Sequence, residues 1–151
     1  MARAPLRDVA EAAARHQVTT WHKYRDGRWD TPGLSGVPGS NIIPRVYGGE
    51  DLHSDAAYCT ALGKYLLTVQ TGSAHKLLLF SSADGITWSQ EAILDETEDA
   101  VLQPYSAFVD FNSPSNDGSV VDGEFYIYFP RKRMDDRNQD DMFRTLIRIR
   151  E

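Results

Sequence analysis

The apolar positions of this chain follow two different periods. Between Leu6 and His16, apolar residues recur every three or four positions with charged residues between them, which predicts a short amphipathic helix within residues 1–16. An apolar stripe this narrow must dock on another surface to be stable. From Gln17 onward, the β-branched and aromatic residues typical of strands become frequent. We therefore expect a helix followed by an all-β domain over 17–151.

The β region divides into two units that show the same arrangement of strands. Residues 18–24 predict one strand before a hairpin turn at Asp26-Gly27, and residues 31–40 are too rich in Gly and Pro for a regular element. The first unit, about 41–102, predicts a four-stranded antiparallel meander with strands at 53–60, 64–71, 76–82 and 87–94. The second, about 103–151, shows only three strands, at 105–111, 124–132 and 142–150.

Repeated four-stranded units of this length are typical of β-propeller blades, each of which buries its faces against its neighbours. We therefore expect a partial β-propeller of about two four-stranded antiparallel blades with a short N-terminal helix. The strand over 18–24 would complete the second blade. Two blades cannot close a ring, so this architecture would need a homodimer, an open stack of sheets or further blades.

Composition and charge narrow the range of partners. The formal net charge is −6, with 22 acidic and 16 basic residues, which is the wrong sign for a nucleic-acid partner. No run approaches the roughly 20 apolar residues of a membrane span, so we expect no membrane partner. The single cysteine, Cys59, excludes an intrachain disulfide and is expected to be a buried core residue. The N-terminal residues do not resemble a secretory signal, and the localisation stays unknown.

The most distinctive motif is the stretch Ser81–Trp88, which reads S-S-A-D-G-I-T-W between two expected strands. Asp84 can accept hydrogen bonds from the backbone amides of a turn, Gly85 can adopt a positive φ, and Trp88 can fold back to pack between sheets. The motif therefore predicts a clip that holds a turn, and not a catalytic device.

This clip resembles the turn between the outer strands of blades in the five-bladed glycoside hydrolases that include arabinanases and β-xylosidases. It is also close to the Asp box of sialidases, which has one more residue between the Asp and the Gly. Further short motifs resemble the later blades of such enzymes: Trp21–Tyr24 with Gly27 and Trp29, Pro32–Gly36, Lys64–Leu67 and Phe143–Arg148. The resemblance implies the C-terminal blades of such a propeller, a carbohydrate partner and a family that is often secreted or periplasmic.

The resemblance also implies where catalytic and binding residues would lie. Enzymes of this family place three acidic residues near the propeller axis, and two carboxylates suffice to break a glycosidic bond. Asp55 is the candidate catalytic residue, since it lies at the entrance of an expected innermost strand, where a propeller presents side chains to its central pocket. The alternative is that Asp55 binds loop amides, which its residue type favours. The candidate substrate-binding residues are His53, on the same strand face, with Gln103, Tyr105 and Arg131 in the second unit.

No cofactor is expected, although a structural calcium ion stays open. The run 136–141 superficially resembles a calcium loop but lacks the Gly and Glu that an EF-hand requires at its sixth and twelfth positions. The sequence thus predicts a glycoside-hydrolase-like protein acting on a polysaccharide or oligosaccharide, incomplete as a single chain. The alternatives are a noncatalytic carbohydrate-binding module and a structural propeller fragment. An enzyme needs two carboxylates within about 10 Å across one pocket, whereas a binding module needs only exposed aromatic and hydrogen-bonding groups.

Overall fold

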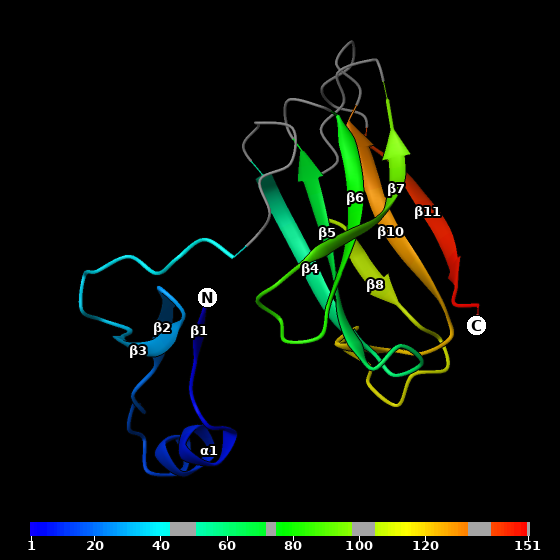
Figure 1. The fold of residues 1–151 in the computed structure, drawn as a ribbon. Helices are drawn as coiled ribbons and strands as arrows, with labels where there is room; N and C mark the ends of the chain where they lie inside the picture. The colour runs from blue at the N-terminus through cyan, green and yellow to red at the C-terminus, as the bar shows by residue number, and fades with distance from the viewer. Residues whose placement is uncertain (43–50, 72–74, 98–104, 133–139, 151) are drawn as a thin grey trace. The chain divides into compact units, whose positions relative to one another are not determined.

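The structure, a computed structural model, describes residues 1–42, 51–71, 75–97, 105–132 and 140–150 (Figure 1). Its regular elements are strands apart from a single helix near the N-terminus, and all but one of the strand pairs are antiparallel. The expected all-β class with a short N-terminal helix is therefore confirmed. The chain forms two compact units, Met1–Ile42 and Ile43–Glu151, which are described separately below.

The N-terminal unit is a helix beside a small sheet. Its elements are β1 (Ala2–Arg3), α1 (Leu6–Ala14), β2 (His22–Arg25) and β3 (Arg28–Pro32). The sheet order is β1-β2-β3, so the strand expected over 18–24 begins only at His22 and pairs on both edges within this unit. Asp26 and Gly27 both have positive φ, at 49° and 84°, which suits the tight turn that joins β2 to β3. The helix is nine residues long. The described part of the chain contains no helix that is long and apolar enough to span a membrane.

The first sheet of the C-terminal unit is the expected meander with one strand added. It contains β4 (Asp51–Cys59), β5 (Lys64–Thr71), β6 (Lys76–Ser82) and β7 (Ser89–Glu96) in antiparallel order. The short strand β9 (Val120–Val121) pairs in parallel with the end of β4. This fifth strand arises from a stretch whose composition predicts a polar loop, because its pairing depends on a partner distant in sequence.

The second sheet has three strands in the described part of the chain. They are β8 (Ala107–Val109), β10 (Glu124–Lys132) and β11 (Asp140–Arg148), in the order β11-β10-β8. Both pairs are antiparallel, and β10 pairs with β11 along its whole length. The three strands expected for the second unit are present, although the first is shorter than predicted.

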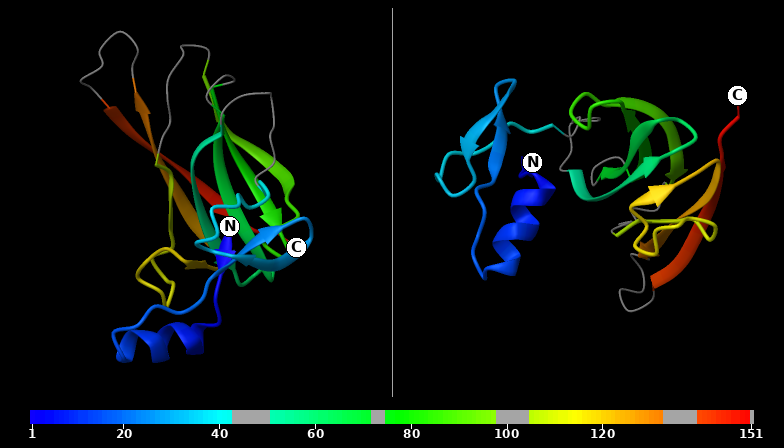
Figure 2. Two further views of the ribbon diagram at one scale, coloured as in Figure 1. Left: turned by 90° about the vertical axis from the view of Figure 1, so that its left-hand side faces the viewer. Right: turned by 90° about the horizontal axis from the view of Figure 1, so that it is seen from below.

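The two sheets of this unit face each other across a shared apolar core (Figure 2). Consecutive residues of strands β5 and β6 are buried. Since successive side chains point to opposite sides of a sheet, both faces of these strands are covered. One face contributes to the core between the sheets, which includes Leu66, Leu77, Leu79, Phe108, Phe125 and Ile127. The opposite face carries a second cluster formed by Leu67, Val69, Leu78 and Phe80, with Trp88 packed against it. Cys59 is 0% exposed in the first core, as expected.

The turn clip before β7 has the predicted backbone geometry. One carboxylate oxygen of Asp84 accepts the backbone N–H groups of Ile86 and Thr87 at 2.8 and 2.7 Å. Gly85 has a φ of 70°. Trp88 packs on the second apolar cluster, which lies on the face of the first sheet that points away from the second sheet. The clip therefore holds the turn that leads into β7, and Trp88 covers part of the outer apolar face of the first sheet.

Candidate functional site

Asp55 lies where β4 meets β8, and its carboxylate is engaged by backbone. One oxygen accepts the N–H of Ala56 at 2.9 Å and the other accepts the N–H of Phe108 at 3.1 Å. Beside it, the buried hydroxyls of Thr68 and Ser106 are 2.6 Å apart, which adds a second polar link between the sheets. This geometry is that of the alternative interpretation, in which Asp55 binds amides. A catalytic role for Asp55 stays a prediction.

The other predicted binding residues lie at separate places. For His53 the structure describes only the backbone, which is part of β4, and Gln103 lies outside the described residues. Tyr105 is 70% exposed and has a φ of 66°, a conformation uncommon for a bulky side chain. Arg131 lies on β10 and bonds to β7, whereas Asp55 bonds to β8. Each of these two charged residues is therefore engaged with a different strand.

Arg131 forms a bidentate ion pair with Asp95 across the two sheets. Its Nε donates to Asp95 Oδ2 at 2.9 Å, and its Nη2 contacts Asp95 Oδ1. The guanidinium carbon also lies 4.3 Å from the ring centroid of Phe143. Hydrogen bonding to Asp95 is the main cause that raises the pKa of Arg131 above its ordinary value, and burial opposes it. This arrangement suits a structural link between β7 and β10.

An aromatic surface on the outer side of the second sheet was not singled out from the sequence. We call it the aromatic face and define it by Phe111, Tyr126, Tyr128 and Arg144. The rings of Phe111 and Tyr126 are 5.8 Å apart, and those of Tyr126 and Tyr128 are 6.2 Å apart. Phe111 is 71% exposed, both tyrosines are half-buried, and Arg144 is exposed. The three rings thus form a row that solvent can reach.

Arg144 is fixed in place by both tyrosines. Its guanidinium carbon lies 4.8 Å from the ring centroid of Tyr126, and its Nη1 donates to the hydroxyl of Tyr128 at 3.1 Å. Arg144 and Tyr128 are direct partners in the β10–β11 ladder, so the strand register sets this contact. The hydrogen bond to Tyr128 is the main cause that raises the pKa of Arg144.

The sequence does contain a signal for this face. In β10 the stretch from Phe125 to Pro130 forms one run that is apolar as a whole. A period of two separates residues 125–129 into a buried set, Phe125, Ile127 and Phe129, and an outward set, Tyr126 and Tyr128. The hydroxyl groups distinguish the outward set, because buried tyrosines need a hydrogen-bond partner.

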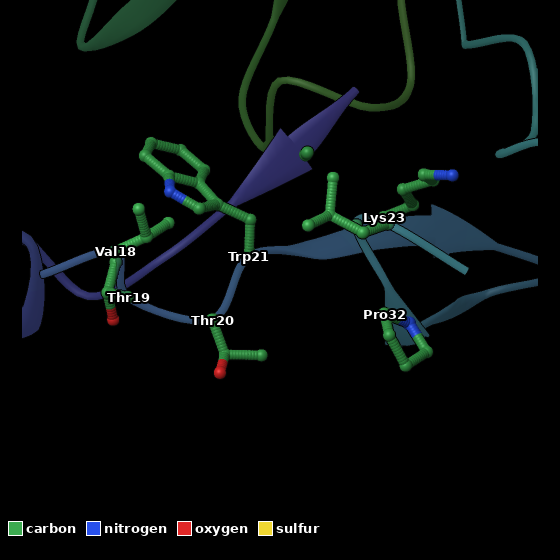
Figure 3. Close-up of a pocket in the computed structure, with 9 residues that line it drawn as sticks. Val18, Thr19, Thr20, Trp21, Lys23 and Pro32 are labelled. Carbon is green, nitrogen blue, oxygen red and sulfur yellow. The ribbon is translucent and has the colours of Figure 1, made fainter. Parts of the chain in front are cut away.

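The N-terminal unit contains an apolar groove of about 510 Å³ (Figure 3). Figure 3 shows Trp21 and Val18 at one end of the groove, and Lys23 and Pro32 at the other. The ammonium group of Lys23 donates to the carbonyl of Val37 at 2.7 Å, so its charge is already engaged. Gly33 allows the close approach of the chain to Trp21, since a Cβ there would lie 3.1 Å from the Trp21 carbonyl oxygen. The groove offers mainly apolar contact.

A second hollow, of about 430 Å³, lies in the loop between β8 and β9. Its carboxylates are engaged within the loop: Asp110 accepts the N–H groups of Asn112 and Asp122 at 2.8 and 2.9 Å. Hydrogen bonds from Ser115 and then Ser119 lower the pKa of Asp117 to about 2. Across the described ranges, no three His, Cys, Asp or Glu side chains gather in a way that could hold a metal ion.

Comparisons with protein-family models, with curated proteins and with solved structures give no match to this chain.

Proposed function

We propose that this chain is a noncatalytic carbohydrate-binding module and that the aromatic face is its binding site. The observation that carries the proposal is the solvent-accessible row of Phe111, Tyr126 and Tyr128 with Arg144 fixed beside it. One side of a sugar ring is formed by C–H groups. Packing this apolar side on an aromatic ring removes it from water and is favourable. The hydroxyls at the ring's edge need donors and acceptors, which the Tyr128 hydroxyl and the Arg144 guanidinium supply.

The engagement of Asp55 supports binding over hydrolysis. Cleavage of a glycosidic bond needs one carboxyl group to protonate the leaving oxygen and a second carboxylate to activate water or attack the sugar. Both oxygens of Asp55 accept backbone N–H groups: one that of Ala56 in the same strand, the other that of Phe108, which joins β4 to β8. A carboxylate held in this way stabilises the fold, and its use as an acid or base would release those amides.

We also propose that the two sheets correspond to neighbouring blades of a β-propeller. Two observations support this: the first sheet contains a four-stranded antiparallel meander, and the sheets pack through apolar side chains of Leu66, Leu77 and Phe125. In this arrangement a homodimer or further blades would complete the ring. A further blade packed on the aromatic face would exclude a sugar from it. Sugar binding at this face would therefore mean that the second sheet is the last blade on that side.

The experiment is a calorimetric titration of the full chain with arabinan, xylan and agar oligosaccharides. Tyr126→Ala removes the central ring of the row and should weaken binding about 10-fold or more, because hot-spot aromatics contribute at least about 1.4 kcal/mol. The matched control is Tyr65→Ala, which removes a 44% exposed tyrosine from the first sheet. Unchanged affinity in Tyr126→Ala would contradict the proposal, as would absence of binding by the wild-type chain both to these oligosaccharides and to the anionic ones tested below. Release of reducing sugar would favour the hydrolase instead.

A further inference from the structure

Arg144 differs from Arg131 and Arg148 in its partners. Arg131 is ion-paired with Asp95, and Arg148 is ion-paired with Glu124 at 2.6 Å on the same side of the sheet as Arg144. Within the part of the chain that the structure describes, Arg144 contacts the ring of Tyr126 and the hydroxyl of Tyr128 but no carboxylate. Its positive charge is therefore not neutralised by any carboxylate among the described residues.

The position of Arg144 prepares it to bind an anion. A guanidinium carries five N–H donors in a planar fork that matches two oxygens of a carboxylate or a sulfate. One of these donors is used on Tyr128, which leaves others for a ligand. The two contacts with the tyrosines hold the side chain in one place, so less conformational freedom is lost when a ligand binds.

The net negative charge of the chain makes the Arg144 guanidinium important for binding an anion. The net charge is −6, so an anionic ligand is repelled at long range and needs a local cation to bind. On the same side of the sheet, Arg148 is already paired, and Arg144 is the group of the aromatic face that can supply this attraction. Arg144 also lies beside the rings of Tyr126 and Tyr128, at the distance at which one ligand can contact an aromatic ring and a guanidinium together.

We propose that the saccharide bound by the aromatic face is anionic, and that its carboxylate or sulfate ester pairs with Arg144 while the adjoining sugar ring packs on the neighbouring aromatic rings. This inference rests on the proposed function and specifies its ligand class. The uronic-acid carboxylate and the sulfate ester share the recognised chemistry, namely a negative charge spread over two or more oxygens, two of which a guanidinium can contact at once. The experiment distinguishes these two sources.

The test uses calorimetric titration of the full chain with three oligosaccharides of equal length: an oligogalacturonate, a sulfated carrageenan oligosaccharide and a neutral xylan oligosaccharide. At least one anionic ligand should bind about 10-fold more tightly than the neutral one, since a hydrogen bond to a charged group contributes about 1.5 kcal/mol or more. Added salt should weaken the anionic complex and leave the neutral complex unchanged, because it screens exposed charges. The tighter of the two anionic ligands identifies the source.

The decisive variant is Arg144→Gln, which keeps a hydrogen-bond donor and removes the charge. It should weaken binding of the anionic ligand about 10-fold more than binding of the neutral one, because Gln can still donate a hydrogen bond to a sugar hydroxyl but carries no charge. The control is the double variant Glu124→Gln with Arg148→Gln, which removes an ion pair from the same face without changing the net charge. It should leave both affinities within about 3-fold, because an exposed pair contributes little.

The outcomes separate this inference from the function on which it rests. Equal affinity for neutral and anionic ligands, or an anionic affinity that Arg144→Gln does not change, overturns the assignment of an anionic saccharide and leaves carbohydrate binding in place. Absence of binding to all three ligands overturns both. A preference for the anionic ligand that disappears in Arg144→Gln, and persists in the double variant, supports both.

Discussion

The two compact units of this chain differ in how much apolar surface they bury. No described residue of Met1–Ile42 is buried, and Val18 and Leu34 are 88% and 99% exposed. In the C-terminal unit, Leu77 and Ile127 are 0% exposed within the core between the sheets. Because burial of apolar surface is the main force that stabilises a fold, we expect the stability of this chain to reside in the C-terminal unit.

The kinds of contact in each unit explain the difference. In the N-terminal unit, α1 is nine residues long and β2 and β3 are joined by a tight turn, so these contacts are local in sequence. Short helices and small hairpins are marginal in water by themselves. The C-terminal unit pairs distant segments, such as β4 with β9, and packs one sheet on another. Contacts between residues close in sequence therefore suffice to form a helix or a hairpin. Pairing and packing of distant segments are needed to bury their apolar side chains.

The largest expected effect tests the core of the C-terminal unit. Phe125→Ala removes a ring that is 1% exposed and packs 5.9 Å from Phe108. The free energy of unfolding should fall by about 3–5 kcal/mol, measured by urea unfolding. The control is Phe111→Ala, whose ring is 71% exposed, with an expected loss of about 1 kcal/mol or less. Similar losses in the two variants would show that burial does not explain the stability of this unit.

A smaller effect is expected for the ion pair that joins β7 to β10. Asp95→Asn breaks the bidentate pair with Arg131 and leaves a guanidinium whose side chain is only 33% exposed. The expected loss is about 2 kcal/mol, because hydrogen bonds to charged groups contribute about 1.5–3 kcal/mol. Glu124→Gln, which breaks the exposed pair with Arg148, should cost about 0.2–1 kcal/mol. If high salt removes the effect of Asp95→Asn, the pair behaves as an exposed one and the prediction is wrong.

Elements with local signals could be predicted from the sequence. The four strands of the meander follow from runs of strand formers separated by turn residues, and the clip at Asp84 follows from residues four positions apart or less. In the N-terminal unit, the helix and the turn at Asp26 and Gly27 have the same local origin. These are the features for which neighbouring residues contain enough information.

Features that depend on tertiary packing could not be predicted in this way. The parallel pairing of β9 with β4 and the pair of Arg131 with Asp95 join segments far apart in the chain. The carboxylate of Asp55 meets the N–H of Phe108 only because the two sheets pack together. Within the candidate site, the alternation of Tyr126 with buried neighbours was visible in the sequence, whereas the contact with Arg144 requires the register of two strands.

The clip provides a pH-dependent test of a local feature in the stable unit. Backbone N–H bonds from Thr87 and Ile86, and then the Ser82 hydroxyl, lower the pKa of Asp84 from 3.8 to about 2. A carboxyl group whose pKa is lower in the folded state stabilises the fold above its unfolded pKa, and this contribution is lost as the pH falls from about 4 to about 2. Asp84→Asn should therefore lower the Tm at pH 6, and the difference from the wild-type Tm should shrink towards pH 2.

This prediction has a direct spectroscopic check. An NMR titration of the Asp84 carboxyl carbon should give a midpoint near 2. An ordinary midpoint, or a difference in Tm that is the same at pH 2.5 and pH 6, would show that the clip does not depend on the charge of Asp84. In that case the turn would be maintained by Gly85 and by the packing of Trp88.

The smallest expected effect tests the N-terminal unit with a matched pair of substitutions. Leu34→Ser replaces a side chain that is 99% exposed, and Leu77→Ser makes the same change at one that is 0% exposed. Leu34→Ser should change the free energy of unfolding by less than about 0.5 kcal/mol, whereas Leu77→Ser should cost several kcal/mol. Urea unfolding of the full chain measures both. A loss above about 1 kcal/mol for Leu34→Ser would mean that this leucine is buried in solution, and the contrast between the two units would then no longer hold.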